Sequence, residues 1–328
     1  MIDLEFHDPR DSDFGPHIVA FGGGTGLSTM LRGLKRHTNN LTAVVTVADD
    51  GGGSGMLRQD LGMLPPGDIR NCILALAETE PLMEKLLRYR FPEGRLRGQS
   101  FGNLFLAAMT GISSSFEEAV QNMSDVLRVT GRVLPVTGDD VELEAVLDNG
   151  ATVRGESHIA AALLQTGAAI RSVRLMPCGA QALPDVVEAI GRADVVVLGP
   201  GSLYTSIIPN ILVGGVAEAL RASAAPKVYV CNIMTQPGET DGMTAFDHAD
   251  AIRAHGGTMS YCIVNGARVP EALRKKYIED GAAPVTPDRA RFAQAGIDLI
   301  EEDLLHIRGD MLRHDYEKLA NMIINLRR

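Results

Sequence analysis

Short apolar runs that end in glycine, aspartate or asparagine recur along the chain and predict buried parallel strands. Residues 17–21 (HIVAF) end at a glycine run, and residues 41–48 (LTAVVTVA), which are rich in β-branched side chains, end at paired aspartates. Residues 194–198 (DVVVL) and 227–233 (KVYVCNI) repeat the pattern. Helical patterns follow these runs, as in βαβ units. We therefore expect an open, mostly parallel sheet with helices on both faces.

The middle of the chain departs from this alternation. Residues 141–147 alternate, Asp148-Asn149-Gly150 is a turn signal, and residues 151–156 return, which predicts a hairpin. We expect one α/β domain over residues 16–328, a β-rich insertion at about 132–178 and a loose tail over residues 1–15. Helices are expected over residues 69–80, 116–128 and 245–254, and a further strand over 261–264.

Composition narrows the class of protein. The 328 residues are 45% hydrophobic and 22% charged, which is ordinary for a globular protein with a large core. A formal charge of −10 argues against nucleic-acid binding, although backbone N–H groups can still hold a phosphate. The four cysteines form no CxxC pair, and neither a signal peptide nor an apolar run of about 20 residues is present. We expect a cytoplasmic protein without a zinc site or membrane contact.

A glycine loop follows the first predicted strand and opens a helix. Its residues are Gly22, Gly23, Gly24, Thr25 and Gly26. Glycine allows close approach of a ligand, and the helix N–H groups favour an anion, so phosphate contact is the functional interpretation. The alternative is a turn needed only for packing. The glycine spacing matches neither a dinucleotide-binding fingerprint nor a P-loop. The missing fingerprint disfavours a nicotinamide dehydrogenase.

Asp49 and Asp50 end the second predicted strand. An acid about 20 residues past such a loop can accept a hydrogen bond from a ribose hydroxyl. Paired carboxylates can instead hold Mg²⁺ beside a phosphate, and a simple Asx-turn is the structural alternative. The glycine run that follows, residues 51–55, favours a mobile ligand loop.

Polar residues also begin two later helices. Asp68 is expected to be a helix N-cap, with Asn71 in the same first turn. Arg70 is disfavoured by the helix dipole there, so it suggests a bound anion. Asn103 fits a cap or a ligand contact equally well.

A second glycine loop and an asparagine complete the candidate set. Gly201 and Ser202 follow the most hydrophobic strand, and Asn232 ends the next strand. Both positions suit phosphate, ribose or base contacts, with a structural turn as the rival for each. The chain contains no HExxH, GxSxG or Cys/His cluster. It is therefore either a binding protein or a group-transfer enzyme that acts by positioning and charge.

Several long blocks in order resemble the gluconeogenesis-factor (YvcK-like) family, which is related to the 2-phospho-L-lactate transferases (CofD-like fold). The matching blocks are AFGGGTGLSTMLRGL, VTVADDGGGSGMLR, PPGDIRNCILALA, SFGNLFLAAMT, LPVTGDDVELEA, LGPGSLYTSIIPN, VYVCNIMTQPGETDG and LRHDYEKLA. The resemblance implies a Rossmann-like three-layer α/β/α fold and a bacterial cytoplasmic protein. It also implies a regulatory role in cell shape and cell-wall homeostasis during gluconeogenic growth.

The resemblance implies a ligand as well. It implies binding of a UDP-sugar, notably UDP-N-acetylglucosamine, without turnover or a required cofactor, and it adds Tyr277 and Arg313 to the ligand-contacting positions. A homodimer and a cell-wall precursor enzyme as protein partner are compatible with it. Relatives often carry threonine where this chain has Tyr316, so the resemblance does not extend to regulation by threonine phosphorylation at that position. The alternative is an Mg²⁺-dependent transferase of phospho groups with a guanine nucleotide-linked substrate, in which Asp49 and Asp50 hold the metal.

Overall fold

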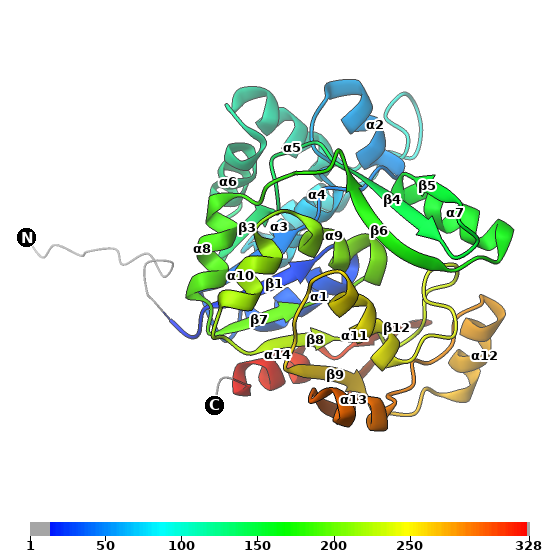
Figure 1. The fold of residues 1–328 in the computed structure, drawn as a ribbon. Helices are drawn as coiled ribbons and strands as arrows, with labels where there is room; N and C mark the ends of the chain where they lie inside the picture. The colour runs from blue at the N-terminus through cyan, green and yellow to red at the C-terminus, as the bar shows by residue number, and fades with distance from the viewer. Residues whose placement is uncertain (1–13, 327–328) are drawn as a thin grey trace, which may run out of the picture.

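A seven-stranded parallel sheet forms the centre of the computed structural model, which describes residues 14–326 (Figure 1). Its strands are β1 (Ile18–Gly22), β2 (Leu41–Val45), β3 (Arg132–Pro135), β7 (Val195–Leu198), β8 (Lys227–Val230), β9 (Tyr261–Asn265) and β10 (Asp298–Glu302). Their order is β10-β9-β8-β7-β1-β2-β3, and every neighbouring pair is parallel. The tail expected at the N-terminus lies almost entirely outside the described residues.

The strand order reverses direction between β1 and β7. The chain moves from β1 to β2 to β3 on one side, and from β7 through β8 and β9 to β10 on the other. Because crossovers between parallel strands are right-handed, the two directions place their helices on opposite faces of the sheet. The predicted α/β fold with helices on both faces is therefore confirmed (Figure 1).

The helices divide accordingly. Those between β1 and β3 are α1 (Gly24–Leu34), α2 (Gly52–Leu61), α3 (Gly67–Leu76), α4 (Pro81–Arg88), α5 (Phe101–Ile112) and α6 (Phe116–Val126). Those around β7 to β10 are α8 (Pro184–Arg192), the π-helical turn η2 (Leu203–Ile207), α9 (Ile208–Leu212), α10 (Val216–Ala222), α11 (Ala245–Ala254), α12 (Glu271–Glu279) and α13 (Arg289–Ala295). The helix predicted over 69–80 ends earlier, because the backbone becomes extended at Ala77.

The core lies on both sides of the central strands. Every residue of β1 and β7 is buried. Strands covered on both faces need no polar side, which explains why these segments are continuous apolar runs without alternation. None of the helices in the described part of the chain is long and apolar enough to cross a membrane.

The predicted insertion is a separate antiparallel sheet. Its strands are β4 (Glu142–Leu147), β5 (Thr152–Arg154) and β6 (Ile170–Met176), in the order β5-β4-β6, with α7 (Glu156–Thr166) between β5 and β6. The insertion begins later than predicted, because Arg132 starts β3 and pairs with β2 in the main sheet. The strand β3 has only four residues, too few for a recognisable pattern.

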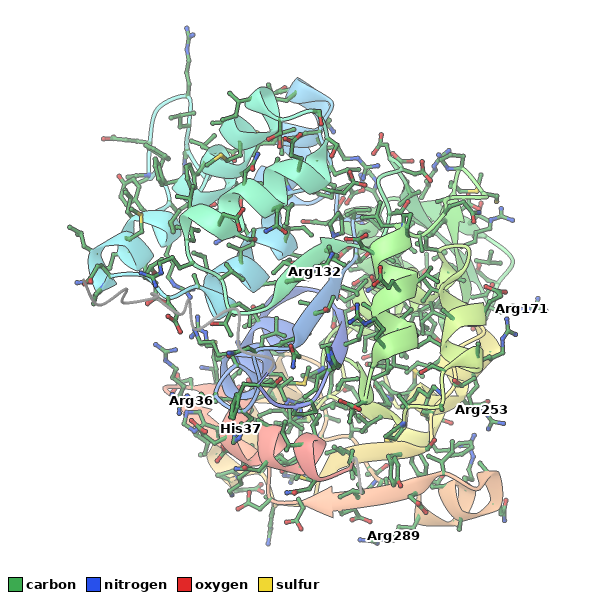
Figure 2. All side chains as sticks on the ribbon, turned by 90° about the vertical axis from the view of Figure 1, so that its left-hand side faces the viewer. Arg36, His37, Arg132, Arg171, Arg253 and Arg289 are labelled. Atoms are coloured by element: carbon green, nitrogen blue, oxygen red, sulfur yellow. The ribbon has the colours of Figure 1, made fainter. Side chains whose placement is uncertain are left out.

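The C-terminal segment packs against the first helix. A hairpin of β11 (Leu305–Arg308) and β12 (Met311–His314) leads into α14 (Tyr316–Asn325), which packs against α1. Arg36, just after α1, pairs with Glu317 of α14, and Figure 2 shows Arg36 beside that helix. The chain end thus covers the helix that the first glycine loop opens.

Candidate functional site

The two glycine loops touch at the point where the strand order reverses. A Cβ atom added to Gly26 would lie 2.6 Å from the backbone oxygen of Pro200, and one on Gly23 would lie 3.2 Å from Oγ of Ser206. The absence of side chains therefore lets the loops after β1 and β7 pack directly together. In open α/β sheets, ligands bind in the crevice at such a reversal.

A carboxylate faces the beginning of α1. Gly23 is the N-cap and supplies no side-chain hydrogen bond, while the Asp68 carboxylate accepts one from the Gly24 N–H. Burial raises the pKa of Asp68 to about 6, and the nearby Asp49 carboxylate adds to the rise. The prediction of Asp68 as an N-cap is wrong. Pro66 holds that position, and Asp68 lies inside α3 and reaches across to α1.

Asp49 and Asp50 point to different partners. Oδ1 of Asp49 accepts a hydrogen bond of 2.8 Å from the Gly51 N–H at the start of α2. Oδ1 of Asp50 accepts one of 2.8 Å from the Ser157 N–H in the first turn of α7, so this carboxylate ties the insertion to the main domain. The mobile loop predicted over residues 51–55 is instead the N-terminal part of α2, because the helix begins at Gly52.

The second glycine loop is held by a buried glutamate. Oγ of Ser202 lies 2.6 and 2.7 Å from the two carboxyl oxygens of Glu239, and the Tyr204 N–H donates to Glu239 at 2.7 Å. Asn232 donates from Nδ2 to the Gly201 carbonyl at 2.7 Å, which fixes the loop from the β8 side. Burial raises the pKa of Glu239 despite these hydrogen bonds.

Glu156, the first residue of α7, joins the same cluster. Its carboxyl bonds to the Thr205 hydroxyl, which lies 2.6 Å from Oγ of Ser202. Burial raises the pKa of Glu156 to about 9, with neighbouring carboxylates as the further cause. These neighbours are Asp49, Asp68 and Glu239. A pKa of about 9 makes Glu156 neutral at pH 7, and a neutral carboxyl can donate a hydrogen bond as well as accept one.

One buried guanidinium offsets this negative charge. Arg70 is only 8% exposed, and its Nε donates to Oδ1 of Asn103 at 3.1 Å, which links the first turns of α3 and α5. Burial, together with the nearby charges of Arg90 and Arg88, lowers the pKa of Arg70 to about 10. It is still charged at pH 7. The side chain of Asn71 bonds to the Asp68 carboxylate instead.

Tyr277 and Arg313 lie together at the β8 end of the site. The Leu312 N–H donates to the Tyr277 hydroxyl at 3.0 Å, and Nη1 of Arg313 donates to the Leu312 carbonyl at 2.9 Å. Nε2 of His314 lies 3.1 Å from the Cys231 carbonyl, next to Asn232. Tyr277 and Arg313 therefore meet at the backbone of Leu312, whereas Asn103 contacts Arg70 in another part of the fold.

Sequence reasoning missed the two glutamates. Glu156 has a weak signal, since it follows Gly155 directly after a strand, as Asp and glycine do elsewhere in the chain. Glu239 lies in a polar segment between β8 and α11 that gives no spacing signal. Both reach the site through contacts between residues far apart in the sequence.

The donor set can be tested for a metal. Among residues 14–326, no group of three or more His, Cys, Asp or Glu side chains is arranged to hold an ion. Mg²⁺ bound beside phosphates needs only one or two carboxylates, with water and phosphate oxygens as the other ligands. Asp49 and Asp50 point to different partners and form no metal cage, so an ion at this site would have to bring most of its ligands with a phosphate.

Two cavities flank the sheet. One of about 790 Å³ adjoins Asp50, between α2 and the insertion. The other, of about 490 Å³, lies at the opposite edge, where its lining includes His17 and Leu41 near the beginnings of β1 and β2. Only the first lies beside the residues described above.

Comparisons with known proteins agree on one family. The sequence model described as 2-phospho-L-lactate transferase CofD matches residues 18–305. The gluconeogenesis factor of Bacillus subtilis is 45% identical over 314 residues, covering 95% of this chain and 98% of that protein. A relative in Thermoanaerobacterium thermosulfurigenes, whose name also places it with the gluconeogenesis factors, is 59% identical over 313 residues, covering 95% and 97%. A crystal structure of a UPF0052 family protein from Bacillus halodurans superimposes with a TM-score of 0.90 at 45% identity, covering 93% of this chain and 98% of that one.

Proposed function

The chain belongs to the gluconeogenesis-factor family within the wider CofD family, and from that membership we propose that it is a regulatory protein that binds a UDP-sugar, notably UDP-N-acetylglucosamine. In this role it acts in the cytoplasm, without turnover, to maintain cell shape and the cell wall during growth on gluconeogenic carbon sources. The ligand acts as the signal, and an enzyme of cell-wall precursor synthesis is the partner that receives it.

One observation carries the proposal. Four loops that are far apart in the sequence, after β1, β2, β7 and β8, meet where the strand order reverses. Two of them are rich in glycine, and these glycines let the two loops pack directly together. The carboxyl ends of the strands at such a reversal are where open α/β sheets bind nucleotides.

The chemistry of the residues suits the parts of a nucleotide sugar. Carboxylates such as Asp49 accept hydrogen bonds from ribose and sugar hydroxyls. The neutral carboxyl of Glu156 can donate a hydrogen bond to a phosphate oxygen. The buried guanidinium of Arg70 supplies the positive charge that a diphosphate requires.

Calorimetry tests this proposal. We expect the protein to bind UDP-N-acetylglucosamine and UDP saturably at one site per chain, and to bind GDP and NAD at least tenfold more weakly. Arg70→Ala is expected to weaken both uridine ligands, with exposed Arg192→Ala as the matched control. Absence of heat and of thermal stabilisation with UDP and UDP-N-acetylglucosamine at millimolar concentration would exclude the proposal.

The second candidate is an Mg²⁺-dependent transferase of phospho groups with a guanine nucleotide-linked substrate. The match to the CofD family over residues 18–305 and the paired acids favour it. Asp49 and Asp50 would hold the ion, which would neutralise phosphate charge during transfer. This candidate requires GDP affinity that rises with Mg²⁺ and falls in Asp50→Asn, whereas the first requires uridine ligands to bind in the presence of a chelator.

A further inference from the structure

The cavity of about 790 Å³ between α2 and the insertion is large enough for a small-molecule group. Its walls come from two parts of the fold, the α2 side of the main domain and the β4–β5–α7 side of the insertion. Most of the side chains that line it are polar. They include Asp50, Arg58, Gln59, Glu142, Arg154 and His158.

Each guanidinium in the wall is matched by an acceptor. Nη2 of Arg58 donates to the Val141 carbonyl at 2.8 Å and pairs with Asp140, and Nε of Arg154 lies 2.6 Å from Oε2 of Glu142. Nη1 of Arg58 is buried and has no acceptor among the described residues. The arginines are fixed in orientation and neutralised, so the wall does not favour a further anion.

This pattern selects a chemical class. Asp50 adds a third carboxylate to the two paired ones, which leaves a small excess of negative charge in the lining. A second phosphate or a carboxylic acid would meet that charge, whereas a neutral group rich in hydroxyls can donate to the carboxylates and accept from the guanidiniums. A sugar ring is such a group.

The cavity adjoins the proposed nucleotide site. Asp50 lines the cavity, while its sequence neighbour Asp49 lies near Asp68 in the carboxylate cluster of that site. On the insertion side, Gly155 and Ser157 line the cavity and Glu156 between them joins the same cluster. The strands β1 and β2 are neighbours, so their ends are about 5 Å apart. A group attached to a diphosphate on the first glycine loop is therefore one strand away from the cavity.

We propose that this cavity receives the glycosyl group of the nucleotide sugar, and that Arg154 and Gln59, from opposite walls, determine which sugar is accepted. The inference rests on the proposed nucleotide-sugar function, and it adds where the glycosyl group of the ligand binds and which class of group that cavity accepts. The insertion then has a functional reason, since it supplies the wall that the sheet alone lacks.

A comparison of ligands with and without the sugar tests the inference. Dissociation constants for UDP and UDP-N-acetylglucosamine are measured by calorimetry on the wild type, on Arg154→Ala and on Gln59→Ala. Arg154 is 53% exposed, so its truncation leaves the core intact. The control is Arg174→Ala, which removes a guanidinium paired with Glu144 on the same small sheet but outside the cavity lining.

Distinct results separate the two proposals. We expect Arg154→Ala to weaken the nucleotide sugar about 10- to 100-fold, the value of one or two hydrogen bonds to a charged group, and Gln59→Ala to weaken it about 2- to 10-fold. Both variants should leave UDP affinity within twofold of the wild type, and Arg174→Ala should change neither ligand. Equal losses for both ligands, or no loss for the nucleotide sugar, would overturn the inference while UDP binding still stands. A wild type that fails to bind even UDP would overturn the proposed function itself.

Discussion

Replacing Glu156 with glutamine perturbs a member of the carboxylate cluster whose pKa is strongly raised. Burial and three neighbouring carboxylates raise the pKa of Glu156 from an ordinary value of 4.5 to about 9. The folded protein keeps this proton at pH values where the unfolded chain has lost it, so stability decreases as pH rises from 4.5 to 9. At pH 7 the difference of about 2.5 pH units corresponds to about 3 kcal/mol.

Glutamine resembles the protonated carboxyl, can bond to the Thr205 hydroxyl and never ionises. We therefore expect Glu156→Gln to exceed the wild type in free energy of unfolding by up to about 3 kcal/mol at pH 7, and to equal it near pH 4. Urea unfolding followed by circular dichroism at pH 4, 7 and 8.5 measures the difference. Glu188→Gln, a 62% exposed carboxylate on α8, is the control and should show no such trend. A difference for Glu156→Gln that does not grow with pH would refute the reasoning.

Three further outcomes are expected. In urea unfolding, Gly26→Ala should destabilise the fold by about 1–3 kcal/mol, because its Cβ would lie 2.6 Å from the Pro200 oxygen. Gly111 lies in α5 with open space around it, so Gly111→Ala should instead stabilise the fold by about 0.5–1 kcal/mol. Asp50→Ala should cost about 1 kcal/mol and speed hydrogen exchange in the first turn of α7, and unchanged exchange there would contradict its capping role. The affinity for UDP, measured by calorimetry, should rise as pH falls from 8 to 6, by at most about tenfold per pH unit, because a bound diphosphate raises the pKa of Asp68 above its value of about 6. An affinity that does not depend on pH would argue against contact between the diphosphate and Asp68.

The sequence predicted the central sheet well because its strands are buried on both faces. The apolar runs of β1 and β7 leave no amphipathic ambiguity, and their glycine endings mark the edge where the loops meet. The edge strand β10 (DLIEE) was not predicted, because it is only half-buried and carries three acids. The short strand β3 was assigned to the insertion for lack of a pattern.

The residues of the candidate site also differ in how far the sequence alone could indicate them. The sequence singled out Asp49 and Asn232 because each follows a predicted strand and parallel topology brings the ends of such strands to one edge, although β2 itself ends earlier, at Val45. The roles of Asp68, Glu156 and Glu239 depend on contacts between distant segments, so no local spacing shows them. Asp68 in particular resembles an N-cap in sequence, yet its carboxylate serves a different helix.

The location of the ligand tests the central claim most directly. A crystal structure of the protein with UDP-N-acetylglucosamine is predicted to show the diphosphate beside the packed loops after β1 and β7, with the sugar directed past Asp50 toward the insertion. Ligand density at the opposite edge, in the cavity lined by His17 and Leu41, would contradict the account.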